Sequence, residues 1–287
     1  MCDFLIGFDP IYRESCLLDI LAKPYEGAAP KGRFFDFPWG SMAVLEERLA
    51  DNRNIIVRGD VIVAWVGDLV LDVSDQFVAR LVDRIRGLMG ANAGDADLQS
   101  DEVFQQLNGT FALAVADSSG VAVITDMLAF TQVYVGKDTQ GSVVCLGTHP
   151  DLVSAICGTR RLDTVSVGEF LSQGTPRFPH TMYENVKELE PGTVHIFRAK
   201  GPKRQTRRFV YWYPPEEIQG QYDVGRLGRE LKERLVVAIR DRCGGNRVGV
   251  TLSGGLDSRL ILAAVPQEYR LCGDNILRLP ESGNAHS

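Results

Sequence analysis

The sequence lacks the features that mark membrane, secreted and nucleic-acid-binding proteins. No apolar run approaches the ~18 residues of a membrane-spanning helix, and the N-terminus lacks the charged and then apolar layout of a signal peptide. The formal net charge is -6 and no long basic run is present, which argues against a nucleic-acid partner because phosphate binding needs clustered Lys and Arg. We therefore expect a cytoplasmic protein that binds neither nucleic acid nor membrane.

The cysteines and histidines lack the spacing of a metal site or a disulfide framework. Six cysteines and four histidines are scattered over 287 residues, and no two cysteines form a C-x-x-C pair. Zinc sites and disulfide-rich domains need closer, patterned spacing, so we predict free thiols and no metal held by cysteine or histidine. The densest basic patch, which we expect to be a solvated loop, consists of Lys203, Arg204, Arg207 and Arg208.

What is present is an ordinary globular composition, 45% hydrophobic and 24% charged, with a length that suits roughly two domains. The first part consists mainly of short β-rich runs separated by turn signals. The runs expected to be strands are 4–8, 54–57, 61–65, 69–71, 110–116, 121–125, 133–135, 142–146 and 192–197, with turns at 58–60, 67–68 and 117–120. Helices are expected at 75–89, 100–107, 151–156 and 165–171, and residues 42–49 fit either class.

The pattern changes after the double proline at 214 and 215, which is the best candidate for a linker. A helix over 224–243, a strand over 248–252, a glycine turn and a helix over 259–265 form the opening of a doubly wound α/β domain. Only residues 266–287 follow, and such a domain needs several more parallel strands with long crossovers. We therefore predict an incomplete, truncated α/β segment.

The glycine turn has the composition of an oxyanion site. Glycines let the backbone amides approach a ligand, the following helix presents its N-terminus, and the serine hydroxyls add donors. Asp257 is placed either to cap the helix or to help hold a metal ion. The alternative is a plain strand-to-helix turn with capping Ser and Asp residues.

Four stretches of the sequence resemble the asparagine synthetase family. SGGLDS at 253–258 looks like the pyrophosphate loop of the ATP-pyrophosphatase superfamily, in its asparagine synthetase branch. LNGTFALAVAD at 107–117 resembles the family hairpin L-x-G-x-F-A-F-A-L-x-D. DMLAFTQVYVG at 126–136 resembles R-D-x-x-G-x-x-P-L-Y-x-G, and ELEPG at 188–192 resembles L-P-P-G before a strand. The resemblance covers most of residues 1–265.

The resemblance implies an α+β fold in two parts. A class II glutamine amidotransferase domain over 1–213, an αββα sandwich of two antiparallel sheets of the N-terminal-nucleophile type, precedes a truncated synthetase segment over 222–287. In the family, glutamine supplies ammonia to an acyl-adenylate made with ATP and Mg²⁺. Cys2, exposed by removal of Met1, acts there as nucleophile with its own α-amine as base, and Gly67 supplies an oxyanion amide. The implied pyrophosphate cradle consists of Ser253, Gly254, Gly255, Asp257 and Ser258.

The chain departs from the family pattern at several positions around the implied nucleophile. Asp3 stands where the family has glycine, and Val66 replaces the asparagine whose side chain completes the oxyanion hole. Valine donates no hydrogen bond, and losing one such donor typically lowers the rate by ~10² to 10³. The glutamine-gripping R-G-P-D motif has no clear counterpart, since Arg58 sits in a tight hairpin too near Gly67 and Arg33 lies in an unmatched stretch. These departures predict an impaired glutaminase.

Three functions therefore stay open. The first is an asparagine-synthetase-like, glutamine-hydrolysing amidotransferase. The second is an ATP-dependent amide-forming enzyme without glutaminase, as in the β-lactam synthetases and lasso-peptide cyclases. The third is a non-catalytic sandwich, in which an uncovered apolar C-terminal segment favours a homo-oligomer.

Overall fold

The computed structural model of the chain describes residues 3–8, 14–25, 31–46, 54–70, 74–90, 98–158, 160–198, 205–216, 223–243, 249–252 and 255–266. The chain forms two compact units, Met1–Pro214 and Pro215–Ser287.

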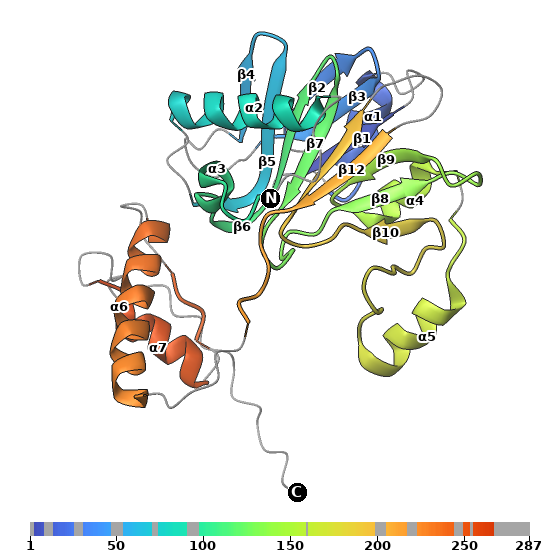
Figure 1. Cartoon of the computed structure of the whole chain (residues 1–287). Helices are drawn as coiled ribbons and strands as arrows, with labels where there is room; N and C mark the ends of the chain where they lie inside the picture. The colour runs from blue at the N-terminus through green and yellow to red at the C-terminus, as the bar shows by residue number, and fades with distance from the viewer. Residues whose placement is uncertain are drawn as a thin grey trace, which may run out of the picture. The chain divides into compact units, whose positions relative to one another are not determined.

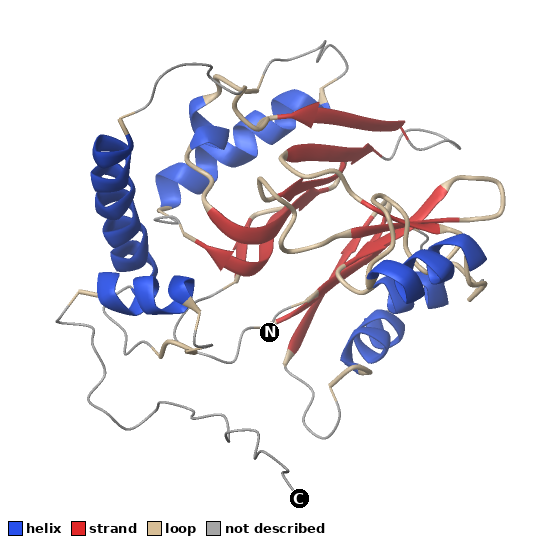
Figure 2. Cartoon of the chain, turned by 90° about the horizontal axis from the view of Figure 1, so that it is seen from below, coloured by secondary structure: helices blue, strands red, loops and turns tan. Residues whose placement is uncertain are grey.

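The first unit contains two six-stranded sheets whose strand pairs are all antiparallel (Figures 1 and 2). Sheet A has the order β10-β8-β9-β1-β3-β2, and sheet B has the order β12-β11-β7-β6-β5-β4. The strands of sheet A are β1 (Phe4–Gly7), β2 (Gly32–Phe37), β3 (Gly40–Leu45), β8 (Tyr134–Lys137), β9 (Val143–Gly147) and β10 (Val186–Glu188). Those of sheet B are β4 (Ile55–Arg58), β5 (Val61–Leu69), β6 (Gly109–Asp117), β7 (Gly120–Thr125), β11 (Thr193–Arg198) and β12 (Gln205–Val210).

The core lies between the sheets and continues on their outer faces. Phe4 and Ile6 of β1 belong to the same buried cluster as Ala112 of β6. Their neighbours Leu5 and Leu113 belong to two other clusters, each under helices. Because successive side chains of a strand point to opposite faces, the central strands are apolar on both sides, which requires a second sheet on one side and helices on the other.

The helices complete four layers (Figure 2). On sheet B lie α2 (Asp75–Met89) and α3 (Glu102–Gln105), whose apolar side chains pack with those of β5 and β6. On sheet A lie α1 (Glu14–Ala22) and α4 (Pro150–Ile156). The remaining helix of this unit is α5 (Thr164–Gln173), which begins after the cap residue Asp163. The predicted α+β sandwich of two antiparallel sheets flanked by helices is therefore confirmed.

Several local predictions need correction. Residues 67–68 form no turn, because β5 runs through them and stays paired with β6 as far as Leu69. The hairpin turn after β6 is shorter than predicted, since Asp117 and Gly120 are already paired as strand residues. The predicted basic loop is also wrong for Arg207 and Arg208, which lie in β12, while Lys203 and Arg204 fall outside the described residues.

The second unit contains two described helices, α6 (Val224–Cys243) and α7 (Leu256–Ala264). The first is the predicted helix, and α7 begins three residues earlier than predicted. Residues 249–252 of the predicted strand have no regular structure, and residue 248 lies outside the described part. A strand needs a partner for its backbone groups, and the described part of this unit contains no second strand. No helix of the described chain combines the length and apolarity needed to cross a bilayer.

Candidate active site

A loop at the end of β7 is built around the buried carboxylate of Asp126. The carboxylate accepts hydrogen bonds from four backbone amides, those of Phe111 at 3.2 Å, Leu128 at 3.0 Å, Phe130 at 3.1 Å and Thr131 at 3.0 Å. Asp126 is almost fully buried. Hydrogen bonds from amides to a carboxylate are stronger than neutral ones, so Asp126 fixes the shape of residues 126–131.

Gly67 of β5 lies against this loop. Its φ is +87°, and a Cβ atom there would lie 2.1 Å from the carbonyl oxygen of Thr110 and 2.8 Å from Oγ1 of Thr131. Only glycine tolerates both this backbone conformation and this approach. The implied oxyanion residue is therefore exposed in β5, beside the loop that Asp126 organises.

The same loop is joined to the turn before β11. The amide of Gly192 donates to the carbonyl oxygen of Asp126 at 2.9 Å, and Oγ1 of Thr125 donates to the carbonyl oxygen of Glu190 at 2.6 Å. The Tyr211 hydroxyl donates to the carbonyl oxygen of Thr125 at 2.7 Å. The motifs at 126–136 and 188–192 therefore contact each other and form one support.

A second polar cluster surrounds Asp3, the residue that follows Cys2 in the sequence. Oδ1 of the buried Asp3 accepts from the Thr148 hydroxyl at 2.8 Å, and Oδ2 accepts from the Tyr25 hydroxyl. Nε2 of His149 lies 3.2 Å from Oδ2, an ion-pair distance without the angle of a hydrogen bond. Asp3, at the position where the resemblance expects a small glycine, thus carries a carboxylate that Tyr25, Thr148 and His149 contact from loop positions just after α1, after β9 and before α4.

The electrostatics of this cluster favour a charged histidine. The carboxylate of Asp3 raises the pKa of His149 above its usual range, although burial of the ring opposes this. His149 is also the cap residue of α4. The Asp3 carboxylate therefore stabilises the protonated form of His149 relative to the neutral form.

The remaining positions of the family pattern serve packing or structural ion pairs. Val66 is buried in the core between the sheets. Arg58 pairs with Asp75 at the start of α2, and the guanidinium of Arg33 lies 5.2 Å from the ring centre of Phe35. Both arginines thus have structural contacts, so neither stands out as a ligand for glutamine.

The glycine turn of the second unit is described only in part. Gly255 is the cap residue of α7, Asp257 lies exposed in its first turn, and the hydroxyl of Ser258 lies 3.4 Å from the carbonyl oxygen of Gly255. Ser253 and Gly254, like Cys2, lie outside the described residues. No group of three or more His, Cys, Asp or Glu residues in the described ranges is placed to hold a metal ion.

Sequence analysis missed most of the residues around Asp3. Tyr25, Thr148 and His149 are far from Asp3 in the sequence, and each stands alone in its segment, so no local pattern marks them. The only indication of these residues in the sequence was the carboxylate of Asp3, at a position where the resemblance leads us to expect glycine. A buried acid needs partners, which predicts donors without saying where they come from.

Comparisons with known proteins agree with a glutamine amidotransferase domain. Residues 97–212 match the glutamine amidotransferase domain family. This segment contains the Asp126 loop and the turn before β11, but neither Cys2 nor Gly67. The prediction of a glutamine amidotransferase domain is confirmed for this segment. No curated protein sequence matches the chain.

Three solved structures are similar in part. Glutamine phosphoribosylpyrophosphate amidotransferase from B. subtilis, complexed with ADP and GMP, is 14% identical with a TM-score of 0.33, covering 72% of this chain and 43% of its own. An allosteric regulatory enzyme of purine biosynthesis is 10% identical with a TM-score of 0.33 and the same coverage, 72% and 43%. A glutamine aminotransferase class-II domain protein from Silicibacter pomeroyi is 10% identical with a TM-score of 0.30, covering 72% and 91%. This chain thus spans less than half the length of the first two.

Proposed function

We propose that the first unit is a class II glutamine amidotransferase domain that hydrolyses glutamine and releases ammonia. The observation that carries the proposal is the family match over residues 97–212, the segment that contains the Asp126 loop beside Gly67. In the proposed reaction, Cys2 attacks the amide carbon of glutamine after Met1 is removed, and the α-amine of Cys2 takes the thiol proton.

The proposed oxyanion site is weaker than that of a complete family member. We assign one donor to the backbone amide of Gly67. Position 66 offers no second side-chain donor, because Val66 is apolar and buried. Removal of one oxyanion donor typically lowers kcat by ~10² to 10³, so we expect slow but measurable glutamine hydrolysis.

We further propose that the ammonia serves an asparagine-synthetase-like, ATP-dependent amidation. The support is the resemblance of residues 253–258 to a pyrophosphate loop and the position of Gly255 at the start of α7. Ser253, Gly254, Gly255, Asp257 and Ser258 would hold the pyrophosphate of ATP with Mg²⁺. Binding of ATP and Mg²⁺ measured by calorimetry tests this step, and a Gly255→Asp variant, which adds a carboxylate at the proposed phosphate site, should abolish it.

The glutaminase proposal is tested by measuring ammonia released from glutamine. Cys2→Ala should reduce release to the background of buffer, whereas Cys16→Ala, which removes an exposed thiol on α1, should leave it unchanged. Mass spectrometry should find Met1 removed from the active protein. Equal ammonia release from the parent protein and Cys2→Ala would contradict the proposal.

A second candidate function is an amide-forming enzyme without glutaminase. It is favoured by two observations, the buried Val66 at the proposed oxyanion position and the polar cluster around Asp3, the residue that follows Cys2 in the sequence. This alternative predicts pyrophosphate release from ATP with a carboxylate substrate and no ammonia from glutamine. Absence of both activities in a folded protein would favour the non-catalytic sandwich.

We also propose that the second unit self-associates. Leu227 and Leu231 of α6 are 40% and 64% exposed, and uncovered apolar faces favour burial against another surface. Analytical ultracentrifugation should find a concentration-dependent oligomer that Leu231→Lys weakens. A monomer at all concentrations would contradict this.

A further inference from the structure

Two cysteines meet in the layer between sheet A and α4. Cys145 lies in β9 and is fully buried, and Cys157 is the C-terminal cap residue of α4 and is partly exposed. Their Sγ atoms are 3.7 Å apart. Both are free thiols. Joining them as a disulfide requires the sulfurs to move from 3.7 Å to about 2.05 Å apart.

The surroundings favour this approach. Gly136 of β8 is paired with Cys145 across the sheet, and a Cβ atom at position 136 would lie 2.4 Å from Sγ of Cys157 and 2.7 Å from Sγ of Cys145. Glycine therefore leaves the space that the two sulfurs occupy. Cys157 ends its helix and is followed by Gly158 at φ +70°, so its backbone lies at the end of a regular element where adjustment is easiest.

The two thiols differ in pKa, and reaction with a peroxide requires one thiol that ionises readily. A hydrogen bond from Cys145 lowers the pKa of Cys157, and the same contact together with burial raises the pKa of Cys145. The thiolate is the reactive form of cysteine. Cys157 is also partly exposed whereas Cys145 is fully buried, so a peroxide reaches Cys157 first. Cys157 is therefore assigned as the attacking sulfur, and Cys145 as the thiol that resolves the product.

We propose that Cys145 and Cys157 form an oxidative modification site, at which a peroxide converts the two thiols into an intramolecular disulfide. The Cys157 thiolate attacks one peroxide oxygen, the O–O bond breaks, and hydroxide leaves and is protonated to water, which leaves a sulfenic acid on Cys157. The Cys145 sulfur loses its proton and displaces the sulfenic oxygen as a second water, forming the S–S bond. The peroxide accepts the two electrons that the sulfurs lose.

The modification acts on a helix that also supports the Asp3 cluster. The N-cap residue of α4 is His149, which lies beside Asp3, and its C-cap residue is Cys157. The site itself rests on the geometry of the two thiols and does not depend on the proposed glutaminase.

A single tryptic peptide reports the site. No lysine or arginine lies between Lys137 and Arg160, so both cysteines fall in peptide 138–160. The folded protein is treated with a small excess of hydrogen peroxide, alkylated under denaturing conditions and digested. We expect this peptide to carry no alkyl group and to be lighter by two hydrogen atoms than the reduced, unalkylated peptide. Reduction before alkylation should restore two alkylated cysteines.

Matched variants separate the proposed chemistry from general oxidation. In Cys145→Ser, Cys157 should accumulate as sulfinic acid because no resolving thiol is present. Gly136→Ala should slow disulfide formation several-fold by displacing the sulfurs, while Gly168→Ala, which adds a methyl group to open space on α5, should not. Two alkylated cysteines in peptide 138–160 after peroxide treatment would overturn the proposal, and so would sulfinic acid on Cys157 of the parent protein.

Discussion

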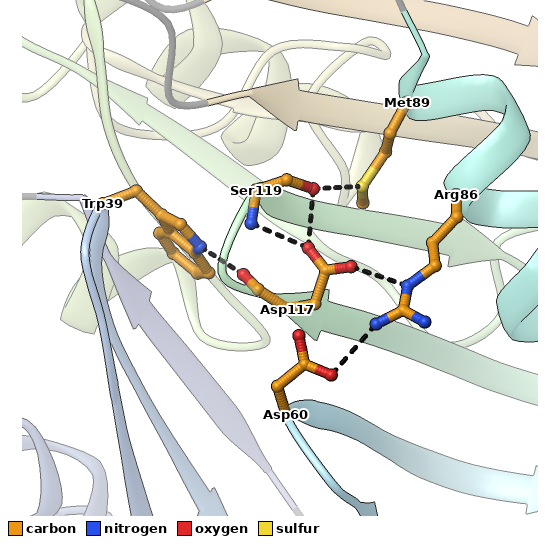
Figure 3. A network of polar contacts seen from close by, with 6 residues as sticks. All are labelled: Trp39, Asp60, Arg86, Met89, Asp117 and Ser119. Atoms are coloured by element: carbon orange, nitrogen blue, oxygen red, sulfur yellow. Dashed lines mark hydrogen bonds and ion pairs between the residues drawn. The ribbon is translucent and has the colours of Figure 1, made fainter.

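Trp39 donates its indole N–H to the backbone carbonyl oxygen of Asp117 in sheet B, at 2.7 Å (Figure 3). Trp39 lies in the turn between β2 and β3, and Asp117 is the last residue of β6. The hydrogen bond is buried, and the ring of Trp39 stacks on Phe37 with centres 4.8 Å apart. It ties the two sheets together at the end where the β6–β7 turn leaves the core.

The side chain of Asp117 joins the same place to α2. Its carboxylate accepts from the amide and hydroxyl of Ser119 at 2.8 and 2.6 Å and from Nε of Arg86 at 3.0 Å (Figure 3). Burial alone would raise the pKa of Asp117, but these hydrogen bonds outweigh it and hold that pKa below its usual range. Asp117 is the final aspartate of the motif at 107–117. Its hydrogen bonds to Ser119 and Arg86 explain why a carboxylate stands at this position.

Asp117→Asn should lower the free energy of unfolding by about 1 to 3 kcal/mol at neutral pH, because the amide gives Ser119 and Arg86 a weaker acceptor. A carboxyl group whose pKa is lowered by folding stabilises the protein above its unfolded pKa and loses that contribution as the pH falls through the folded pKa. The difference between the parent and Asp117→Asn should therefore shrink below about pH 4, as urea unfolding at several pH values would measure.

The matched control for this substitution is Asp60→Asn. Asp60 contacts the same guanidinium, with Oδ1 3.0 Å from Nη2 of Arg86, but its side chain is 60% exposed. Exposed ion pairs contribute about 0 to 1 kcal/mol. An equal loss of stability in both variants would mean that Asp117 acts through surface charge and not through its buried hydrogen bonds.

Asp126→Ala should disorder the loop over 126–131. Four backbone amides lose a charged acceptor, and burying them unsatisfied costs about 1 to 3 kcal/mol for each group that water does not reach. We expect the amides of Leu128, Phe130 and Thr131 to lose protection from hydrogen exchange, while the amides in the centre of β6 keep theirs. Unchanged protection of the loop amides would contradict the role given to Asp126.

Gly67→Ala tests the close approach of β5 to Thr110. Left-handed φ costs an ordinary residue about 1 to 2 kcal/mol, and overpacking adds about 1 to 3 kcal/mol, so we expect a total loss of about 2 to 5 kcal/mol. Gly141→Ala is the control, because Gly141 has a similar φ of +80° but no atom within 4 Å of the added Cβ. Gly67→Ala should lower the midpoint of urea unfolding clearly more than Gly141→Ala does.

Local patterns predicted the long helices well and the irregular parts poorly. α2 was predictable because its apolar residues recur at helical spacing and Ser74 caps its start, with Oγ accepting from the amide of Phe77. Gly67 and Asp68 look locally like a turn, but pairing with β6 keeps them in a strand. β2 escaped prediction because its sequence has no clear alternation, and it is held by pairing with β3 across the turn at Trp39.

In the candidate site, too, residues in contiguous motifs were predictable, whereas residues brought together only by folding were not. The loop at 126–131 and the glycine at position 67 follow from motif resemblance, because both lie in contiguous stretches of sequence. The Asp3 cluster does not, since Tyr25 and His149 reach Asp3 only through the packing of sheet A with its helices. Contacts between single residues that are distant in the chain leave no periodic trace in the sequence.

Val66→Asn tests whether position 66 supplies an oxyanion donor. The substitution places an amide in the core between the sheets, where Val66 is 7% exposed, so we expect a loss of stability of about 1 to 3 kcal/mol. If the side chain at this position faces the proposed oxyanion, glutamine hydrolysis should rise by ~10-fold to 10²-fold in kcat, toward the value of a two-donor site. Val66→Ala is the control, because it removes volume without adding a donor. A folded Val66→Asn variant with unchanged kcat would place the second donor elsewhere.

His149→Gln should remove a stabilising charge that depends on pH in the opposite sense to Asp117. Because the carboxylate of Asp3 raises the pKa of His149 on folding, the protonated ring stabilises the folded state below its unfolded pKa, about 6.5. That contribution disappears as the pH rises through the folded pKa. The parent should therefore exceed His149→Gln in unfolding free energy at pH 5 to 6, and the gap should narrow above pH 8. NMR titration of the His149 ring should give a midpoint above that of an unperturbed histidine, about 6.5. A midpoint at or below about 6.5 would mean that the Asp3 carboxylate is held by Tyr25 and Thr148 alone, through neutral hydrogen bonds.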